Sequence, residues 1–287
     1  MMKQLTIISG KGGTGKTSVT AAFTTLSESH VIADCDVDAA DLHLILDPTI
    51  KKREDFFGGK IAHLDRQKCQ ECDECLRVCR FKAIENYTVD TLSCEGCGVC
   101  VQACPEGAIT LEQHRSGQWF ISDTRCGPMI HAQLGIGEDN SGKLVSLVRQ
   151  QAKLTAERAS KEYVLVDGPP GIGCPVIAAI TGVDLVLAVT EPTLSGIHDL
   201  KRVVGVANHF SIPVVVCINK YDINPENSLH IEEYCANNRL EVLGKIPYDH
   251  CVTKAMVNKK SIVEYSCGEV TKEVKLLWDR VREKLNP

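Results

Sequence analysis

The chain has 287 residues, 44% of them hydrophobic, and a formal net charge of -5. This length allows one large or two modest domains with a full core, and the negative charge argues against a nucleic-acid binder that relies on bulk electrostatics. No signal peptide precedes the first apolar run, and the longest apolar stretch is interrupted by Gly182 and Asp184. We therefore expect a cytoplasmic protein without a membrane span.

Five short apolar runs, each ending in small or acidic residues, are the strongest secondary-structure signal. They lie at residues 4–10, 29–36, 163–171, 184–192 and 213–220. Nearly unbroken apolar strands are typical of a parallel sheet that is covered on both faces. Residues 142–160 and 196–210 have helical patterns that suit crossover connections. The sequence therefore predicts an α/β fold with a mostly parallel, doubly wound sheet.

The first apolar run leads directly into GKGGTGKT, residues 10–17, which matches the pattern G-x-x-x-x-G-K-[ST]. Glycines allow backbone N–H groups to surround phosphate oxygens. We expect Lys16 to reach the β- and γ-phosphates of a nucleotide and Thr17 to ligate Mg²⁺. The predicted nucleotide-binding residues of this loop are Gly10, Gly12, Gly13, Thr14, Gly15, Lys16, Thr17 and Ser18.

Eight of the 15 cysteines form an internal repeat, CQECDECLRVC followed by CEGCGVCVQACP. Both copies have the spacing C-x2-C-x2-C-x3-C and resemble two-cluster bacterial ferredoxins. That resemblance implies two 4Fe-4S clusters, each bound by three cysteines of one run and the last of the other. The first set would be Cys69, Cys72, Cys75 and Cys104, and the second Cys94, Cys97, Cys100 and Cys79. Zinc is the competing interpretation, because C-x2-C pairs also bind zinc.

The repeat departs from the ferredoxin pattern at one position. Pro105 follows the last cysteine of the second run, but Arg80 follows the last cysteine of the first. A guanidinium beside a cluster would raise its reduction potential, whereas a solvent-facing Arg80 would have little effect because exposed charges are screened.

The other seven cysteines are scattered, and in a large chain without an export signal we expect them to be mostly buried thiols. They are Cys35, Cys126, Cys174, Cys217, Cys235, Cys251 and Cys267. A metal site that bridges two subunits through Cys126 and Cys174 is a weaker hypothesis, since neither belongs to a C-x2-C pair.

A second lysine in the phosphate loop, Lys11, makes KGGTGKT resemble the deviant Walker A loop of the MinD, ParA and nitrogenase-iron-protein superfamily. The resemblance implies an ATP-sandwich dimer in which Lys11 acts in trans and Lys16 in cis. VIADCDVDAADL resembles the first switch, with Asp36 as the carboxylate that orients or deprotonates the attacking water. VLVDGPPGIG resembles Walker B and the second switch, with Asp167 holding the Mg²⁺ shell.

Two further segments resemble the base-binding parts of that superfamily. CINKYD places Asn219 where the adenine edge is recognised, and Pro247 to Asp249 resembles a later base-contacting loop. NKYD also resembles the guanine-reading motif of GTPases, with Asp222 as its acidic residue. Lys11 and the paired switch motifs favour ATP.

Together these matches resemble MinD-superfamily ATPases with an inserted ferredoxin domain. We expect the ATPase domain at residues 1–59 and 113–287 and the 2 x 4Fe-4S insert at 60–112. The resemblance implies a homodimer, or a heterodimer with a paralogue, that serves a redox or metallocofactor partner protein. The expected function couples ATP binding and hydrolysis to electron transfer. An ATP-dependent cluster carrier or assembly factor, or a regulatory or positioning ATPase, is the alternative, and no nucleic acid or membrane partner is expected.

Two predictions concern helix ends. Asn140 or Ser141 is expected to cap the helix that follows. Residues 270–285 place Val270, Val274 and Leu277 on one helical face, and we expect this helix to pack on the sheet rather than to bind a membrane.

Overall fold

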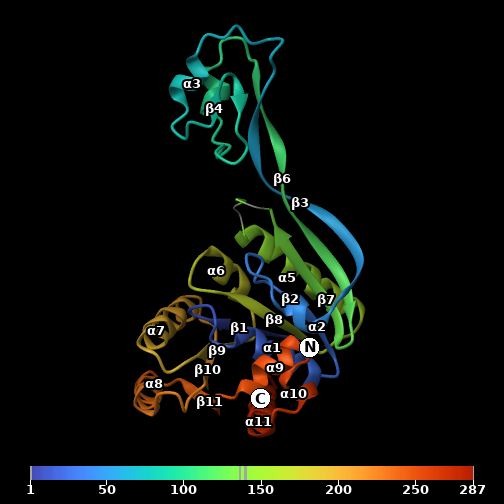
Figure 1. The fold of residues 1–287 in the computed structure, drawn as a ribbon, viewed down its shortest axis with the longest axis vertical. Coiled ribbons are helices and arrows are strands. Elements are labelled where there is room, and N and C mark those ends of the chain that lie inside the picture. The colour runs from blue at the N-terminus through green and yellow to red at the C-terminus, as the bar shows by residue number, and fades with distance from the viewer. Residues whose placement is uncertain (1, 136, 139–140, 287) are drawn as a thin grey trace. The chain divides into compact units, whose positions relative to one another are not determined.

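The computed structural model describes residues 2–135, 137–138 and 141–286. Its strands in the main sheet are β1 (Lys3–Ser9), β2 (His30–Asp34), β3 (Thr49–Leu64), β6 (Ile109–Thr124), β7 (Gly127–Leu134), β8 (Tyr163–Pro170), β9 (Leu185–Thr190), β10 (Val214–Asn219) and β11 (Glu241–Ile246). They are ordered β11-β10-β9-β1-β8-β2-β7-β6-β3 (Figure 1). β1 pairs in parallel with β8 and β9, and β2 pairs in parallel with β8 and β7. The prediction of a mostly parallel α/β sheet is confirmed.

Helices form the crossover connections that join parallel strands. They are α1 (Lys16–Leu26), α2 (Leu42–Leu46), α3 (Glu74–Val78), α4 (Val99–Ala103), α5 (Ser141–Arg158), α6 (Cys174–Ile180), α7 (Leu194–His209), α8 (Pro225–Asn237), α9 (His250–Val257), α10 (Ile262–Tyr265) and α11 (Gly268–Leu285). The expected cap Asn140 lies outside the described residues. Within the described ranges, no helix combines the length and the apolar character needed to cross a membrane.

Both faces of the sheet are covered, and β1 contributes to both cores. Leu5 and Ile7 belong to a cluster with residues of α1 and α11, whereas Ile8 belongs to a second cluster with residues of α6, α7 and α8. Successive strand residues point to opposite faces, which explains this division. A strand buried on both sides must be almost continuously apolar, as the run LTII is, and its one polar residue, Thr6, donates a hydrogen bond to Ala179 O.

The last helix, α11, closes one face of the sheet as predicted. Its buried residues include Val274 and Leu277, and Trp278 packs on Phe23 of α1 with ring centroids 4.9 Å apart. The apolar stripe therefore faces the protein core, where burial of each large side chain contributes about 1.5–3 kcal/mol.

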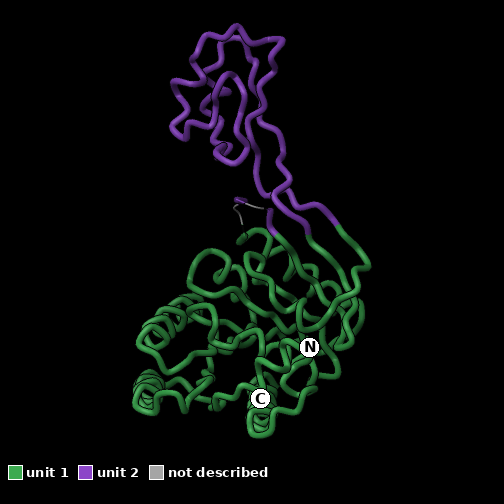
Figure 2. The backbone as a smooth tube through the Cα atoms, in the orientation of Figure 1, with its two compact units in different colours: residues 1–53, 119–133, 141–287 green, residues 54–118, 134–140 purple. Residues whose placement is uncertain are grey.

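The chain forms two compact units (Figure 2). Unit 1 comprises Met1–Arg53, Trp119–Gln133 and Ser141–Pro287, and unit 2 comprises Glu54–Gln118 and Leu134–Asn140. Residues 60–112, which the sequence analysis assigns to an insert, all fall within unit 2. This unit contains α3, α4 and a small antiparallel hairpin of β4 (Ile84–Glu85) and β5 (Thr88–Val89). Its small core joins Ala62, Ile84 and Ile109 to side chains of the cysteine repeat.

The strands β3, β6 and β7 on one side of the main sheet and β11 at its other edge were not predicted. β3 begins with TIKKRED, a charged and exposed stretch without an apolar run. In the sheet β3 lies next to β6. Lys52 Nζ lies 5.7 Å from the ring centroid of Trp119, and Arg53 Cζ lies 5.4 Å from the ring centroid of Phe120. Charged side chains are common on edge strands because they oppose pairing with other chains.

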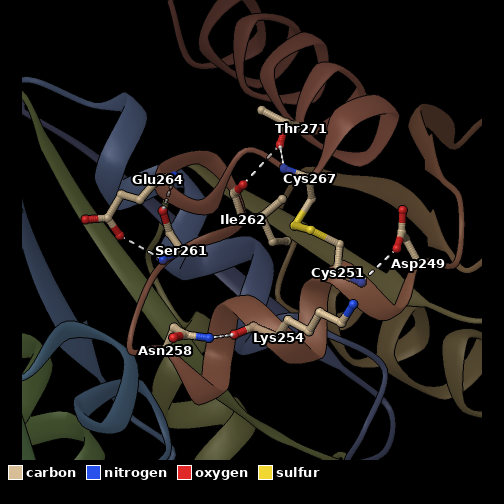
Figure 3. Close-up of a disulfide and its surroundings, with 9 residues drawn as sticks. All are labelled: Asp249, Cys251, Lys254, Asn258, Ser261, Ile262, Glu264, Cys267 and Thr271. Atoms are coloured by element: carbon tan, nitrogen blue, oxygen red, sulfur yellow. Dashed lines mark hydrogen bonds between the residues drawn. A yellow bond between two sulfur atoms is a disulfide. The ribbon is translucent and has the colours of Figure 1, made fainter.

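Three of the seven scattered cysteines are buried thiols as expected, and four are not: Cys126, Cys174, Cys251 and Cys267. Cys251 and Cys267 form a disulfide that joins the start of α9 to the residue before α11, with Cα atoms 5.6 Å apart (Figure 3). The Asp249 side chain accepts a hydrogen bond from Cys251 N, and Thr271 Oγ1 accepts one from Cys267 N. Cys35, Cys217 and Cys235 are buried thiols as expected, whereas Cys174 is exposed.

Candidate functional site

The phosphate loop connects the end of β1 to the first residue of α1. Gly13 and Gly15 have φ angles of 80° and 92°, a left-handed conformation that favours glycine. A Cβ added at Gly15 would also collide with the Asn219 amide. Gly10 packs against Asp199 so closely that a side chain there would clash with its backbone. Three of the four predicted loop glycines are thus required by local geometry.

The carboxyl ends of β1, β8 and β2 bring the predicted catalytic residues together. Lys16 Nζ lies 3.0 Å from Asp167 Oδ1 and 3.3 Å from Asp36 Oδ2. Thr17 Oγ1 donates a hydrogen bond to Asp167 Oδ2 at 2.9 Å. Neighbouring parallel strands end at the same edge of the sheet, so residues about 150 positions apart in sequence share one site.

Burial and charge act in opposite directions on this group. Burial lowers the pKa of Lys16, but the carboxylates of Asp167 and Asp36 outweigh burial, and the pKa is raised overall. Burial raises the pKa of Asp36, with Lys16 opposing it and Asp167 adding to it. Asp34 is fully buried, and burial and the charge of Asp167 raise its pKa well above its usual range. Lys16 is therefore protonated, and the neighbouring carboxylates stabilise its positive charge.

Two buried polar atoms at the site lack a hydrogen-bond partner within the described part of the chain: Thr14 Oγ1 and Asp34 Oδ2. Unpaired buried oxygens are costly and call for an explanation, such as a ligand or an ion. Thr14 belongs to the phosphate loop and lines its pocket, which fits a hydroxyl that contacts a phosphate, whereas Asp34 is buried behind the site and its other oxygen accepts a hydrogen bond from Asp36 N. Asp34 was noted in the sequence only as a neighbour of Asp36.

Lys11 is held by residues of its own chain that sequence reasoning missed. Its Nζ lies 2.6 Å from Glu191 Oε1 and within 3.3 Å and 3.0 Å of the hydroxyls of Thr193 and Ser195. Glu191 directly follows β9, which pairs with β1. An acidic residue at the carboxyl end of a strand beside β1 was the only available signal.

Glu191 also connects Lys11 to a second lysine. Lys220 Nζ lies 2.9 Å from Glu191 Oε2 and donates a hydrogen bond to Gly13 O at 2.9 Å. Burial raises the pKa of Glu191, but hydrogen bonds from Lys11 and Lys220 outweigh burial, and the pKa is lowered overall. Glu191 is therefore ionised at neutral pH and ties two cationic side chains to the phosphate loop.

A pocket of about 380 Å³ extends from the phosphate loop to α9. The predicted residues that line it are Gly12, Gly13, Thr14, Gly15, Lys16, Thr17, Ser18, Asp36 and Asn219. Pro247, Tyr248 and Asp249, the predicted base-contacting loop, line the same pocket, together with Val252 and Met256. One pocket thus joins the polar phosphate end to a more apolar end, which is the form a nucleotide requires.

Asn219 is bonded to the phosphate loop: its Nδ2 donates to Thr14 O at 2.7 Å, and its Oδ1 accepts from Lys220 N at 3.0 Å. Asp222 Oδ1 accepts a hydrogen bond from Tyr248 N at 2.7 Å. Asp222 is not among the described residues that line the pocket.

The eight repeat cysteines line two separate cavities within unit 2. Cysteine site 1 is lined by Cys69, Cys72, Cys75 and Cys104, and cysteine site 2 by Cys79, Cys94, Cys97 and Cys100. These are the same two sets of four that the ferredoxin resemblance implies. In each set, the last cysteine of one run lies among the first three of the other.

Backbone N–H groups point at sulfur in both sites. In site 1, Glu71 N donates to Cys69 Sγ at 3.4 Å, and Ala108 N donates to Cys104 Sγ at 3.3 Å. In site 2, Ala62 N and Ala83 N donate to Cys94 Sγ and Cys79 Sγ, both at 3.4 Å. Such bonds stabilise negative charge on sulfur, as thiolate ligands require.

The thiols surround their cavities rather than converge on one point. Across residues 2–135, 137–138 and 141–286, no three His, Cys, Asp or Glu side chains are placed to hold a single metal ion. The two cysteines outside the repeat that were considered as a metal pair lie elsewhere in unit 1. Cys126 Sγ is 3.8 Å from Thr25 Oγ1, and Cys174 is the exposed first residue of α6, where it packs beside Gly142.

Comparisons with known proteins agree with the geometry of the phosphate loop. The family profile described as "CobQ/CobB/MinD/ParA nucleotide binding domain" matches residues 5–262. The chain is 33% identical to "Uncharacterized protein MJ0578" of Methanocaldococcus jannaschii over 99% of this chain and 98% of that protein. A shorter match, 38% identical, relates 18% of this chain to 65% of "Pyruvate synthase subunit PorD" of Methanothermobacter marburgensis.

Solved structures show the same fold. The septum site-determining protein MinD of Pyrococcus horikoshii, solved as a complex with Mg-ADP, has a TM-score of 0.61 at 18% identity, covering 98% of this chain and 96% of that one. The family profile covers most of the chain, and its phosphate-loop residues lie in the expected arrangement. The chain therefore belongs to the CobQ/CobB/MinD/ParA family of nucleotide-binding proteins.

Proposed function

We propose that the protein is a dimeric ATPase with two 4Fe-4S clusters that couples its nucleotide state to electron transfer for a redox or metallocofactor partner. The observation that carries this proposal is that one chain contains both a P-loop pocket and two cavities lined by four cysteines each. An ATPase without a redox role has no need of eight cysteines arranged in this way.

The ATP site is assigned from the charged cluster at the carboxyl ends of the strands. Lys16 neutralises the β- and γ-phosphates, and Thr17 with Asp167 holds Mg²⁺, which supplies charge neutralisation at the phosphates. Asp36 orients the attacking water. Lys11 acts on the nucleotide of the second subunit, which makes the active form a homodimer or a heterodimer with a paralogue.

ATP is favoured over GTP by the position of Asp222. A carboxylate that reads guanine must face the base, but Asp222 accepts a hydrogen bond from Tyr248 N and does not belong to the described pocket lining. Asn219 lies at the pocket and remains the proposed adenine contact.

The 4Fe-4S assignment is supported by the arrangement of the thiols. Four cysteines surround each cavity, and two N–H groups point at sulfur in each site. A zinc ion requires four ligands at one centre, whereas a cubane separates its four thiolates. The short match to a pyruvate synthase subunit is consistent with this assignment. The clusters would supply one-electron transfer.

Chain connectivity offers a route for coupling. α6 begins three residues after Gly171 of the second switch, and its first residue, Cys174, packs beside Gly142 of α5. Residues 134–138, which precede α5, belong to unit 2, where His114 Nε2 lies 2.6 Å from Glu138 Oε1. The chain thus passes from the unit that carries the cysteine sites into α5, which lies against the helix that follows the second switch.

An ATP-dependent cluster carrier is the less well supported alternative. A cluster held by four thiolates and backbone N–H groups is poorly arranged to leave the protein. Incubation of the loaded protein with a cluster-free ferredoxin and Mg-ATP separates the two functions. The proposed function predicts that iron stays with this chain, and ATP-dependent transfer of iron would favour the carrier.

The cluster assignment is tested by metal analysis of protein purified under anaerobic conditions. We expect brown protein with about eight iron and eight sulfide per chain. Cys79→Ser is expected to damage the cluster of site 2 and spare that of site 1, with Cys174→Ser as a matched control that spares both. Stoichiometric zinc, or selective loss of the other cluster in Cys79→Ser, would contradict the assignment.

A further inference from the structure

The two cysteine sites differ in charge although they match in other respects. Each has four cysteines, two backbone N–H groups that point at sulfur, and one aromatic ring in its lining, Tyr87 in site 1 and Phe81 in site 2. Hydrogen bonds to sulfur and shielding from solvent are two of the factors that set the potential of a cluster. Because both are matched here, the charges that surround the sites become decisive.

Among the described residues that line the two cavities, three carboxylates belong to site 1 and one belongs to site 2. Site 1 is lined by Asp73, Glu74 and Glu106, and site 2 by Glu95. The internal repeat accounts for part of this difference, since Asp73 occupies the position of Gly98 in the second copy. The two copies of the motif therefore share their cysteine spacing but differ in the number of acidic residues.

Nearby cations reduce the difference without removing it. At site 1, Arg77 pairs with Glu74 at 2.5 Å, and Asp73 Oδ1 accepts a hydrogen bond from Tyr87 Oη at 2.6 Å. At site 2, Arg80 lies 5.5 Å from the ring centroid of Phe81, directly after the ligand Cys79. Arg66 lies 5.4 Å from the ring centroid of Tyr87 at site 1, but it pairs with Glu71, so this pair adds no net charge. Counting Arg77 and Arg80 then leaves about two net negative charges at site 1 and none at site 2.

A cluster gains one negative charge when it accepts an electron, so neighbouring carboxylates disfavour its reduced form and a neighbouring cation favours it. From this charge distribution, and given that the proposed clusters are present, we infer that site 2 has the higher reduction potential and accepts the first electron, whereas site 1 holds the low-potential cluster. Each step adds one electron from an external one-electron reductant. Site 1 is then the source of the more strongly reducing electron.

Potentiometric titration followed by electron paramagnetic resonance tests the inference on the full chain. Wild-type protein is expected to titrate in two one-electron steps. At a given potential, the reduced-to-oxidised ratios of the two clusters should differ on the order of tenfold. This corresponds to a difference of about 59 mV between their reduction potentials. The triple variant Asp73→Asn, Glu74→Gln, Glu106→Gln is expected to shift the lower step upward and leave the upper step in place. Asparagine suits position 73 because it tolerates the left-handed conformation there, with φ of 64°.

Two single variants at site 2 provide the matched controls. Glu95→Gln is expected to shift only the upper step upward, and Arg80→Gln to shift only that step downward. Asp73, Arg80, Glu95 and Glu106 are exposed to solvent, so their charges are screened and high salt should narrow the gap between the two steps. Iron content in each variant separates folding defects from electrostatic effects.

The inference is overturned if the triple variant shifts the upper step, or if the two steps coincide in wild-type protein with eight iron bound. That failure is distinct from failure of the proposed function, in which no iron-sulfur signal appears at all. If the iron-sulfur signal is present and removal of the three carboxylates shifts only the lower-potential step, then site 1 holds the low-potential cluster and site 2 is reduced first.

Discussion

Lys11 Nζ lies 2.6 Å from Glu191 Oε1 of the same chain. A lysine that acts on the nucleotide of a second subunit must exchange this contact for the phosphates. Because Lys220 also pairs with Glu191, the carboxylate keeps one partner when Lys11 leaves. The exchange therefore costs less than breaking an isolated ion pair, and the arrangement is compatible with reversible assembly.

Lys11→Ala is expected to weaken ATP-dependent dimerisation while each monomer still binds ATP. Lys3→Ala is the control, because Lys3 has a similar exposure, 29% against 30%, and a similar ion pair with Asp184. Light scattering with ATP in the Asp36→Ala background measures the dimer. Equal dimerisation by the Lys11 and Lys3 variants would exclude a contact made in trans.

Lys16→Ala and Asp36→Ala are expected to separate binding from turnover. Lys16 pairs with two buried carboxylates and faces the phosphates in the ground state, so its loss should abolish tight ATP binding. Asp36→Ala should preserve binding and reduce hydrolysis by about 10² to 10⁴-fold, the usual contribution of a positioned acid-base group. Isothermal titration and phosphate release measure the two effects. Normal hydrolysis by Asp36→Ala would show that another group orients the water.

The site residues that were predicted lie in short segments with a recognisable pattern, although Asp36, Asp167 and Asn219 are far from the phosphate loop in sequence. The loop 10–17 and the two cysteine runs carry their spacing in one short segment each, so local pattern suffices to identify them. Local pattern does not identify the partners of Lys11. Glu191 lies 180 residues away in sequence and is brought beside Lys11 only by the pairing of β1 with β9. Lys220 reaches the phosphate loop for the same reason.

The strands that were predicted are nearly continuous apolar runs, whereas the missed strands β3, β6, β7 and β11 contain charged or polar residues within them. β1, β8 and β9 are nearly continuous apolar runs. β3 begins with charged residues, and only its pairing in the sheet identifies this segment as a strand. The disulfide was missed because Cys251 and Cys267 meet only after α9, α10 and α11 have packed.

The disulfide is expected to stabilise both the fold and the nucleotide pocket. It joins α9 to α11, and Val252 of α9 and Val270 of α11 both line the pocket. Closing a loop of this length contributes about 3 kcal/mol to the free energy of unfolding. Cys251→Ser should lower that free energy by a comparable amount and weaken ATP binding. Chemical denaturation measures the first effect, with Cys174→Ser as the control. Unchanged stability and affinity would show that the bond is dispensable.

The ion pair between Arg125 and Glu264 predicts a loss of stability in acid. Hydrogen bonds from Arg125 outweigh the effect of burial and lower the pKa of Glu264 to about 2. A carboxylate with a lowered pKa stabilises the fold above its unfolded value near 4.5, and this contribution is lost as the pH falls toward 2. Because Glu264 is partly exposed and its charge is screened by solvent, we expect a contribution of about 1 kcal/mol. The difference in unfolding free energy between wild type and Glu264→Gln should therefore be largest above pH 5 and should shrink in acid. A pH-independent difference would contradict the assignment.

The most direct test of the central claim is the affinity for ATP, measured by anaerobic titration calorimetry with the clusters oxidised and then reduced. If nucleotide state and redox state are coupled, the dissociation constant must change between the two, because linkage between sites is reciprocal. A coupling free energy of about 1–3 kcal/mol corresponds to a change of roughly 5–150-fold. His114→Ala, which removes the contact with Glu138, should reduce that change while leaving both sites loaded. Identical ATP affinities in the two redox states would contradict the coupling and favour a regulatory ATPase that merely carries the cysteine-bearing unit.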